Sequence, residues 1–271
     1  MDARTSLREA AARFSFSATP RLDAELLLAH SLGISRELLL LDPNRAVPPG
    51  FAALVERRAR HEPVAYITGS RGFWSIDLAV GPGVLVPRAD SETLMEAAVA
   101  HFAGSAGPSR VLDLGTGPGT LLLAALAEWP GATGLGVDAS GKALDFARAN
   151  AAALGMEARA SLREGDWAAG VEERFDLILC NPPYIATGDE LPAEVSRYEP
   201  AGALFAGADG LDAYRLIVPD LPRLLAAGGV ACLEIGHTKG AAVMAMVREQ
   251  GMTAAVRPDL GGRDRCVVVT G

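Results

Sequence analysis

From Arg110 to the C-terminus, short apolar runs alternate with longer segments of helical period, and this alternation restricts the fold more than any other feature. Each run is long enough for one buried strand, and glycines, prolines or polar residues end it. Strands that alternate with helices at this spacing are typical of a doubly wound α/β fold with a mostly parallel sheet. The expected strands are 110–114, 133–137, 159–164, 175–180, 229–235, one at Val256 and 266–269, and the expected helices lie near 90–102, 119–128, 141–154, 212–226 and 239–250.

Residues 1–70 predict a small helical domain, which can help to hold a macromolecular substrate. Pro20 can occupy the first position of a helix that Gly33 ends, because proline suits a helix start and glycine the position after a helix end. Two further short helices are expected over 34–41 and 49–60. The residues expected on apolar helical faces are Leu7, Ala11 and Phe14 before Pro20, and Leu22, Leu26 and Leu27 after it.

Residues 71–87 predict a β-hairpin that links the helical domain to a sheet domain of residues 88–271. The run 73–80 has a strand-like period, Gly81-Pro82-Gly83 is a turn signal, and 84–86 is again apolar. The two apolar runs are therefore expected to pair across that turn.

The composition bounds what the chain can bind. Its 271 residues are 49% hydrophobic, which is enough for a full core, and the net charge is −8. Residues 1–85 carry ten arginines and nine acids, so the front is almost neutral and the remainder is acidic. An acidic chain is a poor candidate for binding the backbone of nucleic acids, so no stable nucleic-acid complex is expected.

The cysteines and the apolar runs exclude other classes. Cys180, Cys232 and Cys266 are far apart and form no Cys-x-x-Cys pair, so we expect neither a disulfide framework nor a metal site. No apolar run approaches ~18 residues, and the N-terminus has no basic-then-apolar signal segment. A cytoplasmic protein without membrane contact is therefore expected.

A strand that runs into a glycine-rich turn and then a helix predicts a nucleotide-binding loop. The stretch is Val111-Leu112-Asp113-Leu114-Gly115-Thr116-Gly117-Pro118-Gly119, and its glycines let the backbone approach a ligand at the helix N-terminus. The dinucleotide fingerprint needs a third glycine at position 120, where this chain has Thr120. Asp113 adds negative charge beside the loop, which disfavours a pyrophosphate and suits an ammonium or sulfonium group. The turn therefore favours S-adenosylmethionine over NAD.

Acidic and aromatic residues follow the next two expected strands. Asp138 ends the second strand, where a carboxylate can accept hydrogen bonds from both ribose hydroxyls. Asp166 and Trp167 follow the third strand and can hold an adenine by hydrogen bonding and stacking. Taken alone, Asp138 is also typical of a helix cap and Trp167 of a core aromatic, but their order along the sheet favours a cofactor site. The expected cofactor-binding residues are Asp113, Gly115, Thr116, Gly117, Pro118, Gly119, Asp138, Asp166, Trp167 and Asn181.

Asn181-Pro182-Pro183-Tyr184 comes directly after the apolar strand 175–180. Prolines lack the donor that a central strand needs, so the chain breaks at the sheet edge where such folds bind ligands. The Asn181 side-chain oxygen and the Pro182 carbonyl can accept hydrogen bonds from a planar –NH2 group, and the Tyr184 ring can pack against it. Such a clamp orients a poorly nucleophilic nitrogen for methyl transfer and stabilises the positive charge that develops on it. The expected catalytic residues are Asn181, Pro182 and Tyr184, and the expected substrate-binding residues are Asn181, Pro182, Pro183 and Tyr184.

Motifs along nearly the whole chain are similar to those of one family. They are 61–69 (HEPVAYITG), Phe73-Trp74, 85–92 (LVPRADSE), 113–117, Asp166-Trp167, 181–185 (NPPYI), Tyr198-Glu199-Pro200 and 259–265 (DLGGRDR). On these motifs the chain closely resembles the release factor glutamine methyltransferases of the HemK/PrmC type, which are class I S-adenosylmethionine-dependent methyltransferases. One departure is Ala89, where the family often has proline, in the turn before a helix.

The resemblance implies a Rossmann-like sheet of seven strands, mostly parallel, whose last strand is antiparallel. It implies methylation at N5 of the glutamine in the Gly-Gly-Gln motif of class 1 peptide chain release factors. It also implies cofactor contacts from residues 115–119, Asp138, Trp167 and Asn181, and substrate contacts from residues 181–184. We expect an active enzyme that is a monomer.

Two other functions use the same features. The Asn-Pro-Pro-Tyr motif is shared with adenine-N6 methyltransferases of nucleic acids, which flip the base out of the helix. The cluster Arg57-Arg58-x-Arg60-His61 would favour that alternative, although it is also typical of a solvated helix face. A cofactor-binding scaffold without turnover would be indicated by a changed Asn181 or Tyr184, and both are present.

Overall fold

The computed structural model describes residues 2–42 and 44–271, and the chain divides into two compact units. One unit is Met1–Ser70 with Leu191–Tyr198, and the other is Arg71–Glu190 with Glu199–Gly271. The short segment 191–198, which the sequence pattern places in the sheet domain, packs with the helices instead. We call the two parts the helical unit and the sheet unit.

The helical unit is built from short helices around a core of its own, which includes Phe14, Leu27 and Leu28. Side-chain caps begin two of the helices: Asp2 accepts from the Thr5 N–H and Ser35 from the Leu38 N–H. The helices are α1 (Ala3–Ala12), α2 (Pro20–Leu32), α3 (Arg36–Leu41), α4 (Phe51–Ala59), α5 (Val64–Thr68) and α9 (Ala193–Ser196).

Helix α2 begins and ends where the sequence predicts, but its buried face differs. Pro20 is the first helical residue, and Gly33 ends the helix with a φ of 65°. Leu22, which we expect on the apolar face, is 37% exposed. Ala24 and Leu28 are completely buried instead, because the helix contacts neighbours on more than one side and its apolar face is turned relative to the simple pattern.

The hairpin is tighter than the sequence predicts. Strand β1 (Ser70–Phe73) pairs with β2 (Ile76–Ala79), and the turn is at Trp74 and Ser75 rather than at Gly81-Pro82-Gly83. Residues 84–86 form no strand. The strand-like pattern over 73–80 therefore contains both a strand end and the turn, and Trp74 takes the left-handed φ of 54° that closes it.

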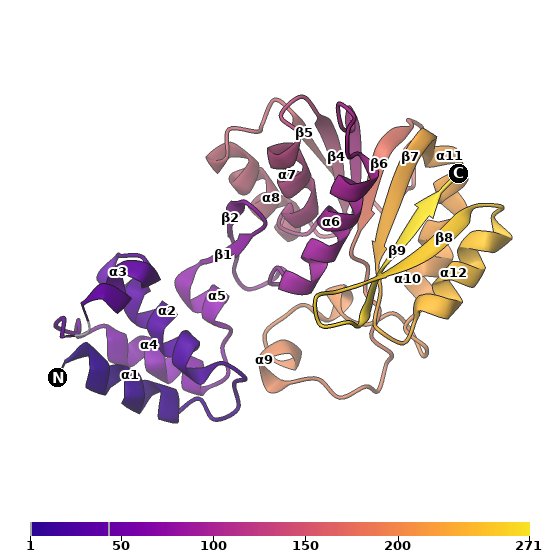
Figure 1. Ribbon diagram of the computed structural model, residues 1–271. Helices are drawn as coiled ribbons and strands as arrows, with labels where there is room; N and C mark the ends of the chain where they lie inside the picture. The colour runs from indigo at the N-terminus through magenta and orange to yellow at the C-terminus, as the bar shows by residue number, and fades with distance from the viewer. Residues whose placement is uncertain (1, 43) are drawn as a thin grey trace. The chain divides into compact units, whose positions relative to one another are not determined.

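The sheet unit contains the expected seven-stranded sheet, in the order β5-β4-β3-β6-β7-β9-β8 (Figure 1). Strands β3 to β7 are parallel, and β9 runs antiparallel to both β7 and β8. The order reverses beside β3, which is where such sheets bind ligands. The strands are β3 (Arg110–Leu114), β4 (Thr133–Asp138), β5 (Ala160–Glu164), β6 (Phe175–Cys180), β7 (Leu225–Glu234), β8 (Thr253–Pro258) and β9 (Asp264–Thr270).

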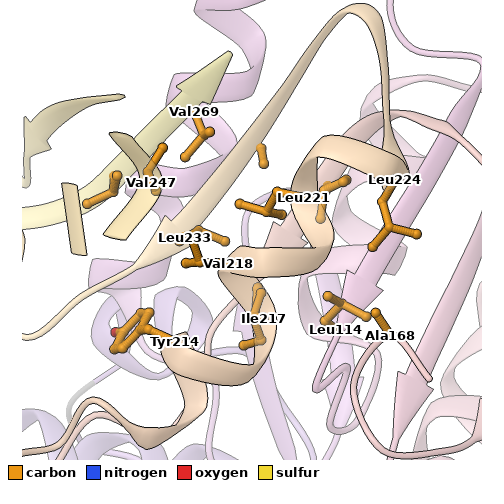
Figure 2. Close-up of a cluster of buried hydrophobic side chains, with 14 of the residues drawn as sticks. Leu114, Ala168, Tyr214, Ile217, Val218, Leu221, Leu224, Leu233, Val247 and Val269 are labelled. Carbon is orange, nitrogen blue, oxygen red and sulfur yellow. The ribbon is translucent and has the colours of Figure 1, made fainter. Parts of the chain in front are cut away.

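Helices cover both faces of the sheet. Figure 2 shows Ile217, Leu221 and Leu224 packed against strand residues such as Leu233 on one face. On β7, Ala231 belongs to this cluster and the next residue, Cys232, is also completely buried, so the opposite face is covered too. The helices of the sheet unit are α6 (Glu92–His101), α7 (Thr120–Glu128), α8 (Gly141–Ala153), α10 (Asp212–Ile217), α11 (Leu221–Leu224) and α12 (Gly240–Glu249).

The single helix expected over 212–226 is broken. Helix α10 passes into the 3-10 turn Val218–Asp220 and then into α11, and residues 225–226 already belong to β7. Pro219 and Pro222 explain the break, because a proline inside a helix removes a backbone donor and clashes with the preceding turn. The helix expected from Asp90 likewise begins as the 3-10 turn Ala89–Ser91 before α6.

Candidate active site

A cavity of about 350 Å³ lies in the sheet unit, at the carboxyl ends of the strands next to the point where the strand order reverses. Most of the residues predicted to form the site line this one cavity. Those that line it are Asp113, Gly115, Thr116, Gly117, Pro118, Asp138, Asp166, Trp167, Asn181 and Pro183; Gly119, Pro182 and Tyr184 are outside the lining.

The glycine-rich turn uses its own N–H groups internally. The N–H groups of Gly115 and Thr116 donate to the Val137 carbonyl at 2.8 and 3.0 Å. The Gly117 N–H donates to Oδ2 of Asp138 at 2.8 Å. A phosphate-binding loop presents such donors to its ligand. This turn therefore approaches a ligand with its backbone but does not form a pyrophosphate cradle, which agrees with the preference for S-adenosylmethionine over NAD.

Asp138 is held in place by two backbone donors. In addition to Gly117, the Ser140 N–H donates to Oδ1 at 2.8 Å. Each carboxylate oxygen keeps a further lone pair for a second donor. Because the side chain also lines the cavity, its geometry fits acceptance from a pair of ribose hydroxyls.

Asp113 is buried and has one oxygen to spare. Its Oδ2 accepts from the Thr116 hydroxyl at 2.6 Å and from the Leu122 N–H, in the first turn of α7, at 3.0 Å. Its Oδ1 has no hydrogen-bond partner among the described residues. Burial raises the pKa of Asp113 to about 7, and the charge of Asp138 acts in the same direction. The simple expectation of a fixed negative charge is thus modified: a cationic ligand in the cavity would stabilise the ionised form.

Trp167 lies against the glycine-rich turn. A Cβ at Gly115 would be 3.3 Å from Cζ3 of the indole, so the ring packs directly over that glycine. Trp167 itself has a φ of 47°, an uncommon conformation that turns its side chain out of the strand direction. The ring borders the cavity and fits the stacking role predicted for it, whereas Asp166 is exposed at the cavity rim.

Asn181 is oriented by a serine from another part of the chain. Its Nδ2 donates to Oγ of Ser91 at 3.2 Å, which leaves the side-chain Oδ1 to accept from a substrate. Both Asn181 and Ser91 line the cavity. This is the arrangement that an acceptor for an –NH2 group requires.

Tyr184 is fixed from three sides. Its hydroxyl donates to Oε1 of Glu234 at 3.2 Å, and a Cβ at Gly236 would be 3.2 Å from its ring. A Cβ at Gly210, which has a φ of 72°, would be 2.3 Å from the Tyr184 carbonyl oxygen. Only glycine fits at 210, because any larger residue would displace the motif. The substrate contacts expected of Tyr184 and of the buried Pro182 stay predictions.

The roles of several site residues have no signal in the local sequence. Glu234 looks like an ordinary polar residue at the end of a strand, and Ser91 belongs to the motif 85–92 without any indication of what it contacts. Glu199, whose role the sequence leaves open, is buried, accepts from the Val86 N–H at 3.1 Å and forms an ion pair with Arg88, so it fastens the long loop to the sheet unit. The further lining residues are Gly83, Val84, Leu85, Pro87, Arg88, Ser91, Thr120, Leu121, Val137, Ala139, Ser140, Ala143, Gly165, Pro200, Gly202 and Ala203.

In the part of the chain that the structure describes, no group of histidine, cysteine and acidic side chains could hold a metal ion. None of the helices in residues 2–42 and 44–271 is long and apolar enough to cross a membrane.

Comparison with known proteins identifies the family. The PrmC N-terminal domain family matches residues 5–69, and the methyltransferase small domain family matches residues 89–197. A release factor glutamine methyltransferase of Rhodospirillum rubrum is 47% identical over 92% of this chain and 78% of its own length. The chain belongs to the release factor glutamine methyltransferase family. Members from Caulobacter vibrioides (44% identity, 92% of this chain and 89% of that one) and Mycolicibacterium smegmatis (39%, 98% and 97%) extend the match to nearly the whole chain.

Solved structures of more distant proteins share the fold. A ribosomal protein L11 methylase from Lactobacillus delbrueckii subsp. bulgaricus has a TM-score of 0.52 at 21% identity, over 70% of this chain and 83% of that one. The catalytic domain of hMettl16 has a TM-score of 0.54 at 15% identity, over 83% and 93%. The family member described here therefore has the class I methyltransferase fold that its sequence predicts.

Proposed function

We propose that this protein transfers a methyl group from S-adenosylmethionine to the side-chain amide nitrogen (N5) of the glutamine in the Gly-Gly-Gln motif of class 1 peptide chain release factors. The observation that carries the proposal is the fixed amide of Asn181, which leaves an acceptor oxygen beside a cavity suited to the cofactor. The release factor glutamine methyltransferases that match most of the chain support the same substrate.

Three side chains are proposed to hold the cofactor, which supplies an electrophilic methyl carbon when bound. Asp138 would accept from the ribose hydroxyls, and Trp167 would stack on the adenine. Asp113, with its spare oxygen, would face a positively charged part of the cofactor. The residues present therefore fit a cationic nucleoside better than a dinucleotide.

Asn181 is proposed to accept a hydrogen bond from the glutamine –NH2 group, together with the Pro182 carbonyl. Holding the nitrogen in line with the methyl group replaces a bimolecular encounter by a positioned one. As the nitrogen gains positive charge, these acceptors stabilise it more strongly than in the ground state. No dedicated general base is needed, because the nitrogen's proton becomes acidic only as the methyl group arrives. The proton is then released, and the product of the cofactor is the neutral thioether S-adenosylhomocysteine.

The basic cluster of the helical unit does not favour a nucleic-acid substrate. Arg57 donates to both carboxylate oxygens of Glu62 at 2.8 and 2.5 Å. Arg58 is buried and forms ion pairs with Asp23 and Glu194. Two of the three arginines in the basic cluster are thus paired with acidic side chains of the helical unit, which weakens the case for the adenine-N6 alternative.

Mass spectrometry of a purified release factor after incubation with this protein and S-adenosylmethionine tests the proposal. The expected result is a gain of one CH2 group on the glutamine of Gly-Gly-Gln, and no gain when that glutamine is replaced by alanine. Methylation of adenine in an oligonucleotide, with an unmodified release factor, would favour the alternative. Binding to duplex DNA that falls steeply with added salt would point the same way.

A further inference from the structure

Glu234 is a buried carboxyl that lies beside the Asn-Pro-Pro-Tyr motif without lining the cavity. It is the last residue of β7, and the parallel pairing of Cys180 with Leu233 places it level with Asn181 on the neighbouring strand. Its side chain is only 1% exposed, and Oε2 has no close hydrogen-bond partner among the described residues. A buried acid without an ion-pair partner is costly, so it needs a reason.

The first and last residues of the motif, Asn181 and Tyr184, both lie close to the Glu234 carboxyl, Tyr184 directly and Asn181 through Ser91. At one end, the Tyr184 hydroxyl donates to Oε1 of Glu234 at 3.2 Å. At the other end, the Nδ2 atom of Asn181 donates to the Ser91 hydroxyl at 3.2 Å. The Ser91 side chain lies near enough to the Glu234 carboxyl to lower its pKa, and the unpartnered Oε2 is an available acceptor for the Ser91 proton. The side chain of Ser91 is buried, with 2% of its surface exposed.

The direction of these hydrogen bonds follows from the number of protons available. A serine hydroxyl has one proton to donate and lone pairs to accept. An ionised Glu234 can only accept, so it takes the Ser91 proton. The Ser91 oxygen must then accept from the –NH2 group of Asn181. The Asn181 oxygen is left toward the substrate, which is the orientation that an –NH2 clamp needs.

A protonated Glu234 would reverse the donor directions of the hydrogen bonds between Glu234, Ser91 and Asn181. Its own proton could go to the Ser91 oxygen, and Ser91 could then donate to Oδ1 of Asn181. The Asn181 amide would turn its –NH2 group toward the substrate –NH2 group. Two donors facing each other do not form a hydrogen bond, so the clamp would be lost.

We propose that Glu234 is a positioning residue that acts through Ser91 to hold the Asn181 amide with its oxygen toward the substrate nitrogen, so that methyl transfer requires the ionised form of Glu234. This inference rests on the proposed function and specifies how its clamp is oriented. Glu234 also holds the Tyr184 hydroxyl, so one side chain positions both ends of the motif.

The surroundings of Glu234 place its titration near neutrality. Burial raises its pKa to about 7, and the nearby charge of Asp90 acts in the same direction. The Ser91 and Tyr184 hydrogen bonds and the charge of Arg265 lower it. The titratable groups that face Glu234 are Asp90 and Arg265, with Tyr184, Tyr214, Cys180 and Cys266, and Arg265 is itself shared with Asp90 and Asp259 at 3.1 and 3.2 Å.

The test is the pH profile of kcat at saturating release factor and S-adenosylmethionine, for the unchanged protein and three variants. In the unchanged protein kcat is expected to fall about tenfold per pH unit below an apparent pKa near 7, because kcat reports groups that titrate in the bound complex. Ser91→Ala and Glu234→Gln are each expected to lower kcat about tenfold at high pH and to lose this fall, since one hydrogen bond is removed or misdirected. Glu96→Gln, a half-buried carboxyl that pairs with Arg257, is the matched control and should keep the profile of the unchanged protein.

Several outcomes decide the matter. If kcat of Ser91→Ala still falls at low pH, the proposal that Glu234 acts through Ser91 on Asn181 is wrong. Full kcat of Glu234→Gln at high pH would contradict it as well. In the double variant, kcat should fall no further than in the more impaired single variant, because both substitutions break the same set of hydrogen bonds. A kcat reduced by the product of the two single effects would contradict this. If Glu234→Gln does not fold, the profiles of Ser91→Ala and the unchanged protein still decide. If the unchanged protein is active and its kcat does not depend on pH, only the proposed role of Glu234 is refuted. If no release factor is methylated at any pH, the proposed function itself is refuted.

Discussion

Asp113 and Glu234 are two buried carboxyls at the carboxyl ends of strands in the same sheet, and they differ in what surrounds them. Burial raises the pKa of each to about 7, and each has one oxygen without a close partner among the described residues. Asp113 is among the residues that line the cavity, although its side chain is buried. Glu234 lies outside the lining and accepts from the Tyr184 hydroxyl of the protein itself. Similar burial therefore leaves two buried acids suited to different proposed roles: Asp113 toward a bound cation, and Glu234 toward the residues of the Asn-Pro-Pro-Tyr motif.

The substitution Asn181→Ala should separate the residues that bind the cofactor from those that promote methyl transfer. Asn181 is proposed to act on the transition state, so kcat should fall about 10²- to 10³-fold while the Kd for S-adenosylmethionine stays nearly unchanged. Single-turnover kinetics and calorimetry measure the two quantities. Thr187→Ala, an exposed position farther along the same loop, is the control. Near-normal turnover in Asn181→Ala would sink the proposed clamp.

Glu234→Gln should reveal the cost of burying the acid. A carboxyl whose pKa rises on folding stabilises the fold most at low pH, and that contribution is lost as the pH rises from 4.5 to about 7. The unchanged protein should therefore lose on the order of 3 kcal/mol of unfolding free energy relative to Glu234→Gln between about pH 4 and about pH 8. Denaturant unfolding of the sheet unit measures this difference. An equal difference at both pH values would mean that Glu234 is not titrating as described.

The substitution Asp138→Ala should affect cofactor binding much more than methyl transfer. The variant loses the proposed acceptor for the ribose and also the two backbone hydrogen bonds that Asp138 accepts, so the Kd for S-adenosylmethionine should rise about 10- to 30-fold. The kcat at saturating cofactor should change much less. Asp145→Ala, an exposed acid on α8, is the matched control. Unchanged binding by calorimetry would refute the ribose contact.

Asp113 should give the smallest effect, and one that depends on pH. A positively charged cofactor favours the ionised carboxylate, so below about 7 binding must release a proton. The affinity should then decrease by up to about tenfold per pH unit below that value and stay level above it. Asp113→Asn should bind more weakly at high pH and show no such slope. A slope that persists in Asp113→Asn would assign the titration to another group.

The sequence pattern predicts the sheet better than it predicts the site. Strands such as 110–114 and 175–180 have the predicted bounds because continuous apolar runs in a parallel sheet end where the apolar character ends. The predicted hairpin is present, but its turn lies at Trp74 and Ser75, and the helix predicted over 212–226 is broken by prolines inside the helical period.

The motif residues could be found in the sequence, whereas the contacts that orient them could not. Asp113, Asp138, Trp167 and Asn181 lie at or just beyond the carboxyl ends of strands, and parallel strands bring these ends together. Ser91 is ninety residues away from Asn181 in the chain and meets it only after folding. A glutamate at a strand end gives no local indication that it will be buried, so Glu234 is visible only in three dimensions.

Gly210 has a consequence for how related sequences should be interpreted. Its missing side chain leaves room for the carbonyl of Tyr184, at a position far along the chain from the motif and in a loop of no recognisable pattern. A gene could therefore keep all four letters of Asn-Pro-Pro-Tyr and still encode an inactive protein, if a bulkier residue had replaced this glycine. Searches for degenerate, non-catalytic copies of the enzyme would do well to inspect that glycine as closely as the motif itself.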